Sequence, residues 1–131
     1  MVTLEGAEPL ASIAKMNFQT LGLNNIDIVV GRFQDTLNDV LKKYGPVDYA
    51  FLDGHLDGLA TMDYFKEIIP SCKNKAIFII DNISWSDSMK KAWKIIEADE
   101  RIKISINLRQ MGICIIDNKR VEKQSYKIPL Y

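Results

Sequence analysis

The sequence predicts an α/β fold, a doubly wound Rossmann-like sheet that is mostly parallel, with helices on both faces. Short runs rich in β-branched residues alternate with longer segments that have the spacing of amphipathic helices. The run at 76–80 is apolar without alternation, which is typical of a strand covered on both faces in a parallel sheet. The last two runs, 102–106 and 112–116, are joined by too few residues for a helical crossover, so they predict an antiparallel pair at the C-terminal end.

The predicted strands are the β-branched or apolar runs between these helical segments. They lie at residues 2–4, 26–30, 47–52, 76–80, 102–106 and 112–116. The first predicted helix spans residues 8–21, because Pro9 suits a first turn and Gly22 can adopt the left-handed conformation that ends a helix. The residues expected on its inward face are Leu10, Ile13, Ala14 and Leu21.

Three further helices follow the same logic. The second spans residues 35–44, before Gly45 and Pro46, with Leu37, Val40 and Leu41 on one side. The third spans residues 61–69 and is closed by Pro70. The fourth begins at a capping box formed by Ser84 and Asp87. Its expected inward residues are Met89, Ala92, Trp93 and Ile96.

Composition and charge exclude several classes of protein. The chain has 131 residues, 47% of them hydrophobic and 26% charged, as expected for one soluble globular domain. Basic and acidic residues number 17 each, so no excess of positive charge favours nucleic acid. A membrane-spanning helix needs about 20 apolar residues, and no apolar run in the sequence approaches that length. No secretory signal is visible at the N-terminus. We therefore expect a cytoplasmic protein that binds neither nucleic acid nor a membrane.

The two cysteines and the C-terminal tail give weaker signals. Cys72 and Cys114 stand alone, without a CxxC motif or a Cys/His cluster, so we expect reduced packing residues rather than a structural zinc site. We expect the domain to end near residue 118. Residues 119–131 then form a tail that is either an additional edge strand or an arm.

A carboxylate follows the first predicted strand. Ligands of doubly wound sheets bind at the carboxyl ends of the strands. Glu5 stands at such a place, where one carboxylate can accept hydrogen bonds from both hydroxyls of a ribose. The alternative is a solvated glutamate stabilised by the N-terminus of the following helix.

Two further strands are followed by oxygen-bearing side chains. Asp53, Asp81 and Asn82 are hard ligands that suit Mg²⁺ or Ca²⁺. The alternative is that Asp81 and Asn82 only turn the chain into the next helix. His55, the single histidine, lies in the loop after residues 47–52 and is a candidate general base. A surface histidine without a function is the alternative.

Four segments carry a family resemblance through their order and spacing. They are Val2-Thr3-Leu4-Glu5-Gly6, Gly31-Arg32-Phe33, Val47-Asp48-Tyr49-Ala50-Phe51-Leu52-Asp53-Gly54 and Ile79-Ile80-Asp81-Asn82. Together they resemble the class I S-adenosylmethionine-dependent methyltransferases, and more closely the O-methyltransferase branch. The resemblance covers residues 1 to about 117, including the terminal antiparallel pair.

This resemblance implies methyl transfer from S-adenosylmethionine to a small hydroxyl-bearing molecule. Glu5 would hold the ribose hydroxyls and Asp53 would lie near the methionine end. The implied cofactor-binding residues are Glu5, Gly6, Arg32, Phe33, Gln34, Asp53 and Gly54, with Arg32, Phe33 and Gln34 beside the adenine. In the metal-dependent branch, the positions of Asp53, Asp81 and Asn82 bind a divalent cation such as Mg²⁺, which lowers the pKa of the substrate hydroxyl.

The sequence departs from the family pattern in two places. The family often places a lysine just after the aspartate of the third strand, whereas Gly54, His55 and Leu56 follow Asp53 here. Either His55 acts as base in place of the lysine, with Asp53 as the second catalytic residue, or the metal chemistry is absent. Such enzymes also open with a first strand and a Gly-rich turn, whereas this chain begins at the expected second strand. We therefore expect residues 1–118 to be part of a longer domain. Its open sheet edges would favour a homodimer.

Two other functions are consistent with parts of the pattern. A non-catalytic Rossmann-like module would associate with itself or with a partner through the open sheet. A nicotinamide-dependent dehydrogenase would share the carboxylate at the strand end, but the sequence has no GxGxxG motif and that class does not explain the Asp81-Asn82 pair. We rank the dehydrogenase last.

Overall fold

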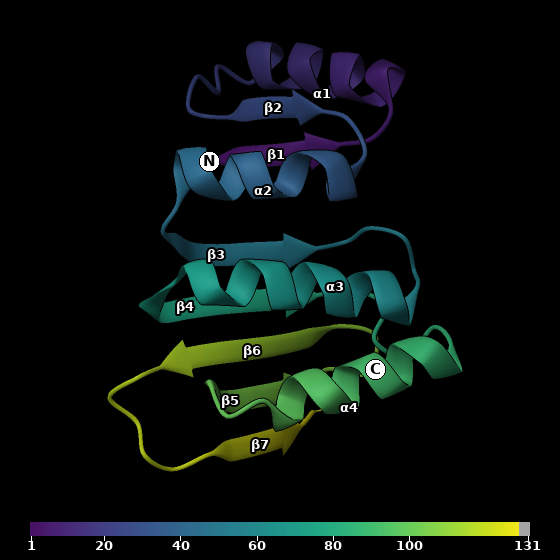
Figure 1. Cartoon of the computed structure of the whole chain (residues 1–131). Coiled ribbons are helices and arrows are strands. Elements are labelled where there is room, and N and C mark those ends of the chain that lie inside the picture. The colour runs from purple at the N-terminus through teal and green to yellow at the C-terminus, as the bar shows by residue number, and fades with distance from the viewer. Residues whose placement is uncertain (129–131) are drawn as a thin grey trace. The chain divides into compact units, whose positions relative to one another are not determined.

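The structure is a computed structural model that describes residues 1–128 and forms two compact units. The N-terminal unit is Met1–Gly45, and the C-terminal unit begins at Pro46. Each unit has a sheet of its own, with two strands in the first and five in the second (Figure 1). The predicted α/β class is confirmed, with both parallel and antiparallel strand pairs among residues 1–128.

The N-terminal unit is a βαβα segment. Its elements are β1 (Val2–Glu5), α1 (Glu8–Thr20), β2 (Asp27–Val30) and α2 (Phe33–Tyr44). The two strands are parallel and in register from Val2 opposite Asp27 to Glu5 opposite Val30. Gly22 has a φ of 68°, which confirms the left-handed end predicted for the first helix.

Helix α1 does not bury the face that the sequence predicts. Leu10 and Ile13 remain 55% and 50% exposed, and Ala11 is the buried residue of this helix. Two strands of four residues present too little apolar surface to cover a helix of 13 residues. In α2, by contrast, Leu37 and Val40 are buried as predicted.

The C-terminal unit holds the larger sheet, with strand order β3-β4-β6-β5-β7. Its elements are β3 (Val47–Leu52), α3 (Gly58–Ile68), the 3₁₀ turn η1 (Ile69–Ser71), β4 (Cys72–Ile80), α4 (Asp87–Ala98), β5 (Ile102–Asn107), β6 (Gly112–Asp117) and β7 (Gln124–Lys127). The predicted antiparallel pair is confirmed as β5 and β6, and β6 also pairs antiparallel with β4. Strand β7 lies parallel to β5 at the edge, so this part of the tail is an edge strand rather than an arm.

Helices α3 and α4 cover one face of this sheet. Phe65 of α3 meets Phe78 of β4 edge to face at a centroid distance of 5.4 Å. Trp93 of α4 lies over Gly112 of β6 so closely that an added Cβ at Gly112 would stand 2.3 Å from the indole ring. The four predicted inward residues of this helix are all buried: Met89, Ala92, Trp93 and Ile96.

The opposite face is open within residues 46–128. Ala76, Phe78 and Ile80 are buried beneath the helices, whereas Ile77 on the other face is 40% exposed. The expectation that both faces of this strand are covered is therefore not met within this unit. The physical reason is that both of its helices lie on the same side (Figure 1).

Two helix starts differ from the sequence prediction. Helix α4 is capped by Ser86, whose Oγ accepts a hydrogen bond from the Met89 backbone N–H, whereas the Ser84 hydroxyl donates to the Gln110 side chain. Helix α3 begins three residues early because the Asp57 side chain accepts from two backbone N–H groups of its first turn. In both cases the side chain that reaches the free N–H groups sets the boundary.

Candidate functional site

Glu5 ends β1 and accepts a hydrogen bond within the turn that leads into α1. Its Oε1 accepts a hydrogen bond of 3.0 Å from the Ala7 backbone N–H, and the residue is half-buried. Ala7 is the N-cap residue of α1, which has no side-chain cap, so this bond holds the turn before the helix rather than the helix itself. Oε2 has no hydrogen-bond partner among residues 1–128 and remains available to a hydroxyl group.

Gly6 and Gly31 keep the ends of β1 and β2 open. A Cβ at Gly6 would meet no atom within 4 Å, so the space beside its backbone is free. Gly31 has a φ of 143° and donates its N–H to the Glu5 carbonyl at 3.0 Å. A side chain there would be strained and would collide with Thr36. Glycine is thus needed to end β2 beside Glu5.

Three predicted adenine contacts lie at the start of α2. Arg32 is the N-cap residue, and its Nε lies 2.7 Å from Asp35 Oδ2. The hydrogen bond and charge of Asp35 raise the pKa of Arg32. Phe33 is half-buried and Gln34 is exposed. The Arg32 guanidinium is therefore engaged with Asp35 on the surface of α2.

Asp53 and Asp81 lie together in the C-terminal unit. Leu52 and Ile80 are opposite one another in the parallel pair β3–β4, and the Asp81 backbone N–H donates to the Leu52 carbonyl at 3.0 Å. Partial desolvation, then the negative charge of Asp81 and a hydrogen bond with it, raise the pKa of Asp53. The two carboxyl groups therefore compete for a proton, which is the arrangement that a bound cation would relieve.

Asn82 supports Asp81 from the next position. Its backbone is left-handed, with a φ of 55°, and its Nδ2 donates to Asp81 Oδ2 at 2.8 Å. The Asn82 carbonyl also accepts from the Trp85 backbone N–H. Asp81 and Asn82 thus turn the chain toward α4, which was the alternative to a metal site. No group of three or more His, Cys, Asp or Glu side chains within residues 1–128 is arranged to hold a metal. The donor set that fits a cation is thus two carboxylates, with the Asn82 amide turned so that its nitrogen meets Asp81.

His55 lies in a strained loop after β3. His55 and Leu56 have φ values of 69° and 34°, a conformation that residues with side chains rarely adopt. The His55 Nδ1 is 3.1 Å from the Tyr64 hydroxyl of α3. Desolvation, then the charges of Asp63 and Glu67, raise the pKa of Tyr64, which keeps this phenol protonated at neutral pH. Tyr64 therefore holds the imidazole by one nitrogen.

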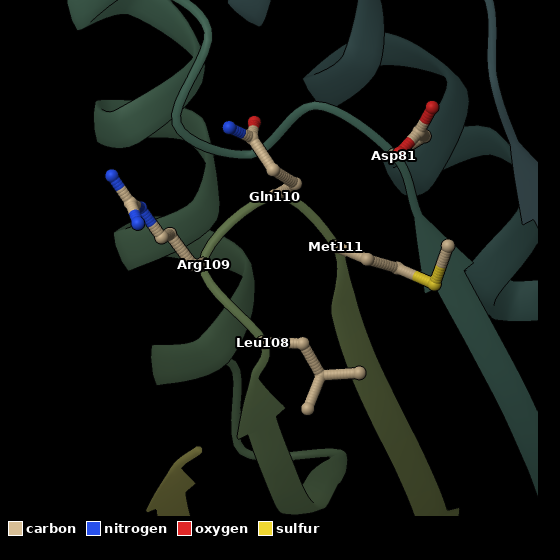
Figure 2. Close-up of a pocket in the computed structure, with 5 residues that line it drawn as sticks. All are labelled: Asp81, Leu108, Arg109, Gln110 and Met111. Carbon is tan, nitrogen blue, oxygen red and sulfur yellow. The ribbon is translucent and has the colours of Figure 1, made fainter. Parts of the chain in front are cut away.

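A shallow pocket of about 330 Å³ lies beside Asp81 (Figure 2). Besides Asp81 it is lined by the turn between β5 and β6, which comprises Leu108, Arg109, Gln110 and Met111. In Figure 2, Leu108 and Met111 extend to one side of this turn and Arg109 and Gln110 to the other. The turn is fixed because the Ile83 backbone N–H donates to the Gln110 carbonyl at 2.8 Å. Asp81 thus stands at the rim of a small cavity with apolar side chains.

Solved structures share this fold. The O-methyltransferase from Bacillus cereus, solved in complex with SAH, matches with a TM-score of 0.71 and 23% identity over 88% of this chain and 61% of its own. Cofactor-bound Rv0187 from MTB matches with a TM-score of 0.70 and 22% identity over 89% of this chain and 61% of its own. TomG, an O-methyltransferase from Streptomyces achromogenes solved with SAM, matches with a TM-score of 0.71 and 16% identity over 88% of this chain and 61% of its own. The chain has an O-methyltransferase fold.

The chain spans 61% of the length of each of these three structures. No protein-family model and no curated protein sequence matches the chain. Within residues 1–128, no helix is both long and apolar enough to cross a membrane.

Within this O-methyltransferase fold, the predicted residues fall into two groups. Glu5, Gly6 and the start of α2 belong to the N-terminal unit. Asp53, Gly54, His55, Asp81 and Asn82 belong to the C-terminal unit. In the second group the structure brings Asp53, Asp81 and Asn82 together, as the spacing predicts.

The sequence did not indicate Tyr64 or the turn at 108–111. Tyr64 is one of several apolar or aromatic residues on the buried side of α3, and nothing in the sequence marks it as the partner of His55. The turn reaches Asp81 because Gly112 pairs with Ile80 in an antiparallel register. That register is set by β6 entering the sheet beside β4. The residue pattern within one strand does not reveal which strand lies beside it or in what register.

Proposed function

We propose that this protein takes part in methyl transfer from S-adenosylmethionine to the hydroxyl group of a small molecule. The observation that carries the proposal is the Asp53–Asp81 carboxyl pair at the carboxyl ends of β3 and β4, in a fold shared with O-methyltransferases. In open α/β sheets this edge is where ligands bind. The neighbours were solved with SAH or SAM, which supports the same cofactor here.

The N-terminal unit would contribute groups that bind the cofactor. The free Oε2 of Glu5 would accept a hydrogen bond from a ribose hydroxyl, and the open space at Gly6 would allow a ligand to approach the backbone. Phe33 and Gln34, with Arg32, would flank the adenine. The C-terminal unit would contribute Asp53 and Gly54 near the methionine end of the cofactor.

The reaction would be an in-line displacement. The acceptor oxygen forms a bond to the methyl carbon while the bond between that carbon and the sulfonium sulfur breaks, and S-adenosylhomocysteine leaves. The hydroxyl proton must be removed, and His55, two residues after Asp53, is the group we assign as its acceptor. Tyr64 would orient the imidazole through Nδ1.

A divalent cation such as Mg²⁺ would be held by Asp53 and Asp81, and Asn82 would be a third ligand through its amide oxygen once its Nδ2 leaves Asp81. The raised pKa of Asp53 beside Asp81 is the observation that fits such an ion, because two adjacent carboxylates gain from a shared positive charge. When bound, the ion would lower the pKa of the acceptor hydroxyl.

Calorimetric titration of the full chain with S-adenosylhomocysteine, with and without Mg²⁺, tests this function. We expect saturable binding that Glu5→Gln weakens by about tenfold, because the single, uncharged amide oxygen of glutamine cannot serve the Ala7 N–H and a ribose hydroxyl as the two carboxylate oxygens do. Glu8→Gln is the matched control, since Glu8 lies in the first turn of α1 and is exposed. Absence of binding, or equal effects of both substitutions, would contradict the proposed cofactor site.

A non-catalytic module that binds a partner through its sheet is the second candidate. The open face of the five-stranded sheet favours it, because exposed apolar surface of this extent is typical of interaction sites. A folded chain that binds no S-adenosylhomocysteine but forms a stable complex would support this candidate over the first.

A further inference from the structure

The loop between β3 and α3 holds the only histidine of the sequence in a strained conformation. His55 and the following Leu56 have φ values of 69° and 34°, and both lie in the left-handed region that favours glycine. Residues with side chains persist there only where the surrounding structure holds them, and such positions are concentrated at functional sites. The contacts that hold His55 are therefore informative about its use.

The C-terminal end of this loop is fixed to two helices. Asp57 Oδ1 accepts hydrogen bonds of 3.0 Å from the backbone N–H groups of Leu59 and Ala60 in the first turn of α3. Gly58 lies against α4, where its N–H donates to Ser88 Oγ at 3.3 Å and where an added Cβ would collide with the Ser88 carbonyl. The loop is thus fixed at this end, and the strain stays in the residues before it.

Tyr64 fixes the imidazole itself. Tyr64 lies on the buried side of α3 and is 8% exposed, so the packing of the helix sets the position of its hydroxyl. That hydroxyl is 3.1 Å from His55 Nδ1, and Nε2 is the ring nitrogen that Tyr64 does not engage. The hydrogen bond at one nitrogen of a histidine decides where the ring hydrogen lies, and therefore which nitrogen can react.

The direction of this hydrogen bond decides which nitrogen carries the lone pair. A neutral imidazole has hydrogen on one nitrogen only, and a phenol hydroxyl can either donate to Nδ1 or accept from it. Burial, then the negative charges of Asp63 and Glu67, raise the pKa of Tyr64. A phenol that holds its proton more tightly is a weaker donor, and its oxygen is a better acceptor. These surroundings favour Nδ1–H as the donor and the Tyr64 oxygen as the acceptor.

We propose that Tyr64 is a positioning residue that keeps neutral His55 in the tautomer with hydrogen on Nδ1, so that Nε2 carries the lone pair. The inference rests on the proposed role of His55 as proton acceptor and adds which nitrogen acts. In that role the lone pair of Nε2 takes the proton of the acceptor hydroxyl, and the electron pair of the O–H bond stays on the oxygen that attacks the methyl carbon. The bond from Nδ1–H to Tyr64 persists and stabilises the imidazolium that results.

Nitrogen NMR of the full chain, with isotope-labelled histidine, tests the proposal. Long-range proton–nitrogen correlations distinguish a ring nitrogen that bears hydrogen from one that carries a lone pair, and the single histidine gives one set of signals. In alkaline solution, where the ring is neutral, we expect the wild-type chain to have hydrogen mainly on Nδ1. Hydrogen mainly on Nε2 would overturn the proposal without the need for any variant.

Tyr64→Phe removes the hydroxyl and keeps the ring that packs in the core. We expect the ratio of the Nδ1–H tautomer to the Nε2–H tautomer to fall by at least about fivefold, because the hydrogen bond that favours the first form is lost. Tyr126→Phe is the matched control, since the Tyr126 hydroxyl bonds to Gln124 on the edge strand β7 and its loss should leave the ratio unchanged. Equal ratios in the wild-type chain and the Tyr64 variant would also overturn the proposal.

The spectrum requires neither cofactor nor acceptor, so it separates this inference from the proposed function. A chain that shows the Nδ1–H tautomer but binds no S-adenosylhomocysteine would support the positioning role of Tyr64 and contradict the proposed cofactor site. A chain that binds S-adenosylhomocysteine but has hydrogen mainly on Nε2 would do the reverse.

Discussion

At the scale of single residues, the carboxyl pair of Asp53 and Asp81 is the strongest chemical signal in the chain. Partial desolvation together with Asp81 raises the pKa of Asp53. A carboxyl group whose pKa is raised on folding binds its proton more tightly in the native state. Its contribution to stability is therefore largest at pH below the ordinary carboxyl value and decreases as the pH rises through the raised pKa.

Replacement of Asp81 by asparagine should lower the pKa of Asp53. The substitution removes the neighbouring negative charge while it keeps the size of the side chain, and the part of the shift that comes from desolvation should remain. NMR titration of the Asp53 carboxyl carbon measures this directly. Asp87→Asn is the control, because Asp87 pairs with Lys90 at the start of α4 and should leave the Asp53 titration unchanged. An Asp53 pKa that does not move in the Asp81 variant would show that the two carboxyl groups do not interact.

At the scale of elements, helix α4 is held on β6 by the absence of a side chain at Gly112. A Cβ at this position would stand 2.3 Å from Trp93, and Trp93 is itself 4% exposed within the core. The indole cannot move outward without opening the contact between helix and sheet. A small residue is therefore required wherever an aromatic ring packs directly on a strand backbone.

Gly112→Ala should destabilise the protein by about 1–3 kcal/mol, the usual cost of overpacking a core. Urea denaturation followed by circular dichroism gives the change in the free energy of unfolding. Gly6→Ala is the matched control, since its Cβ would meet no atom within 4 Å, and it should change stability by less than about 0.5 kcal/mol. Equal effects of the two substitutions would mean that Trp93 is not closely packed on β6.

The elements also show how far the sequence alone can lead. Strand β3 was predicted at residues 47–52, as observed, because a compact apolar run is bounded by Pro46 and the Asp53-Gly54 turn. The predicted cap of α4 was wrong by two residues, because Ser84 and Ser86 are equally good caps in sequence. The structure selects Ser86, since the Ser84 hydroxyl donates to the Gln110 side chain of a distant turn. Spacing therefore predicts strand ends and the residues that follow them, as for Asp53 and Asp81. Contacts between distant segments, such as His55 with Tyr64, depend on packing that one sequence does not contain.

At the scale of the whole molecule, the buried core is divided unequally between the two units. Among residues 1–128, the buried hydrophobic residues of the N-terminal unit are Ala11, Leu37 and Val40, and all the others follow Pro46. A two-stranded sheet with few buried side chains is marginal by itself. A five-stranded sheet with two packed helices has the apolar contacts of an independent domain.

Residues 46–131 expressed alone should therefore fold, whereas residues 1–45 alone should not. We expect the longer fragment to keep helical and strand signals in circular dichroism and to unfold cooperatively in urea, because its core residues, from Ala50 to Ile116, lie within it. The short fragment should show little secondary structure, since its helices bury only three hydrophobic side chains. The full chain measured under the same conditions is the control. A longer fragment without a cooperative transition would mean that the five-stranded sheet depends on residues 1–45.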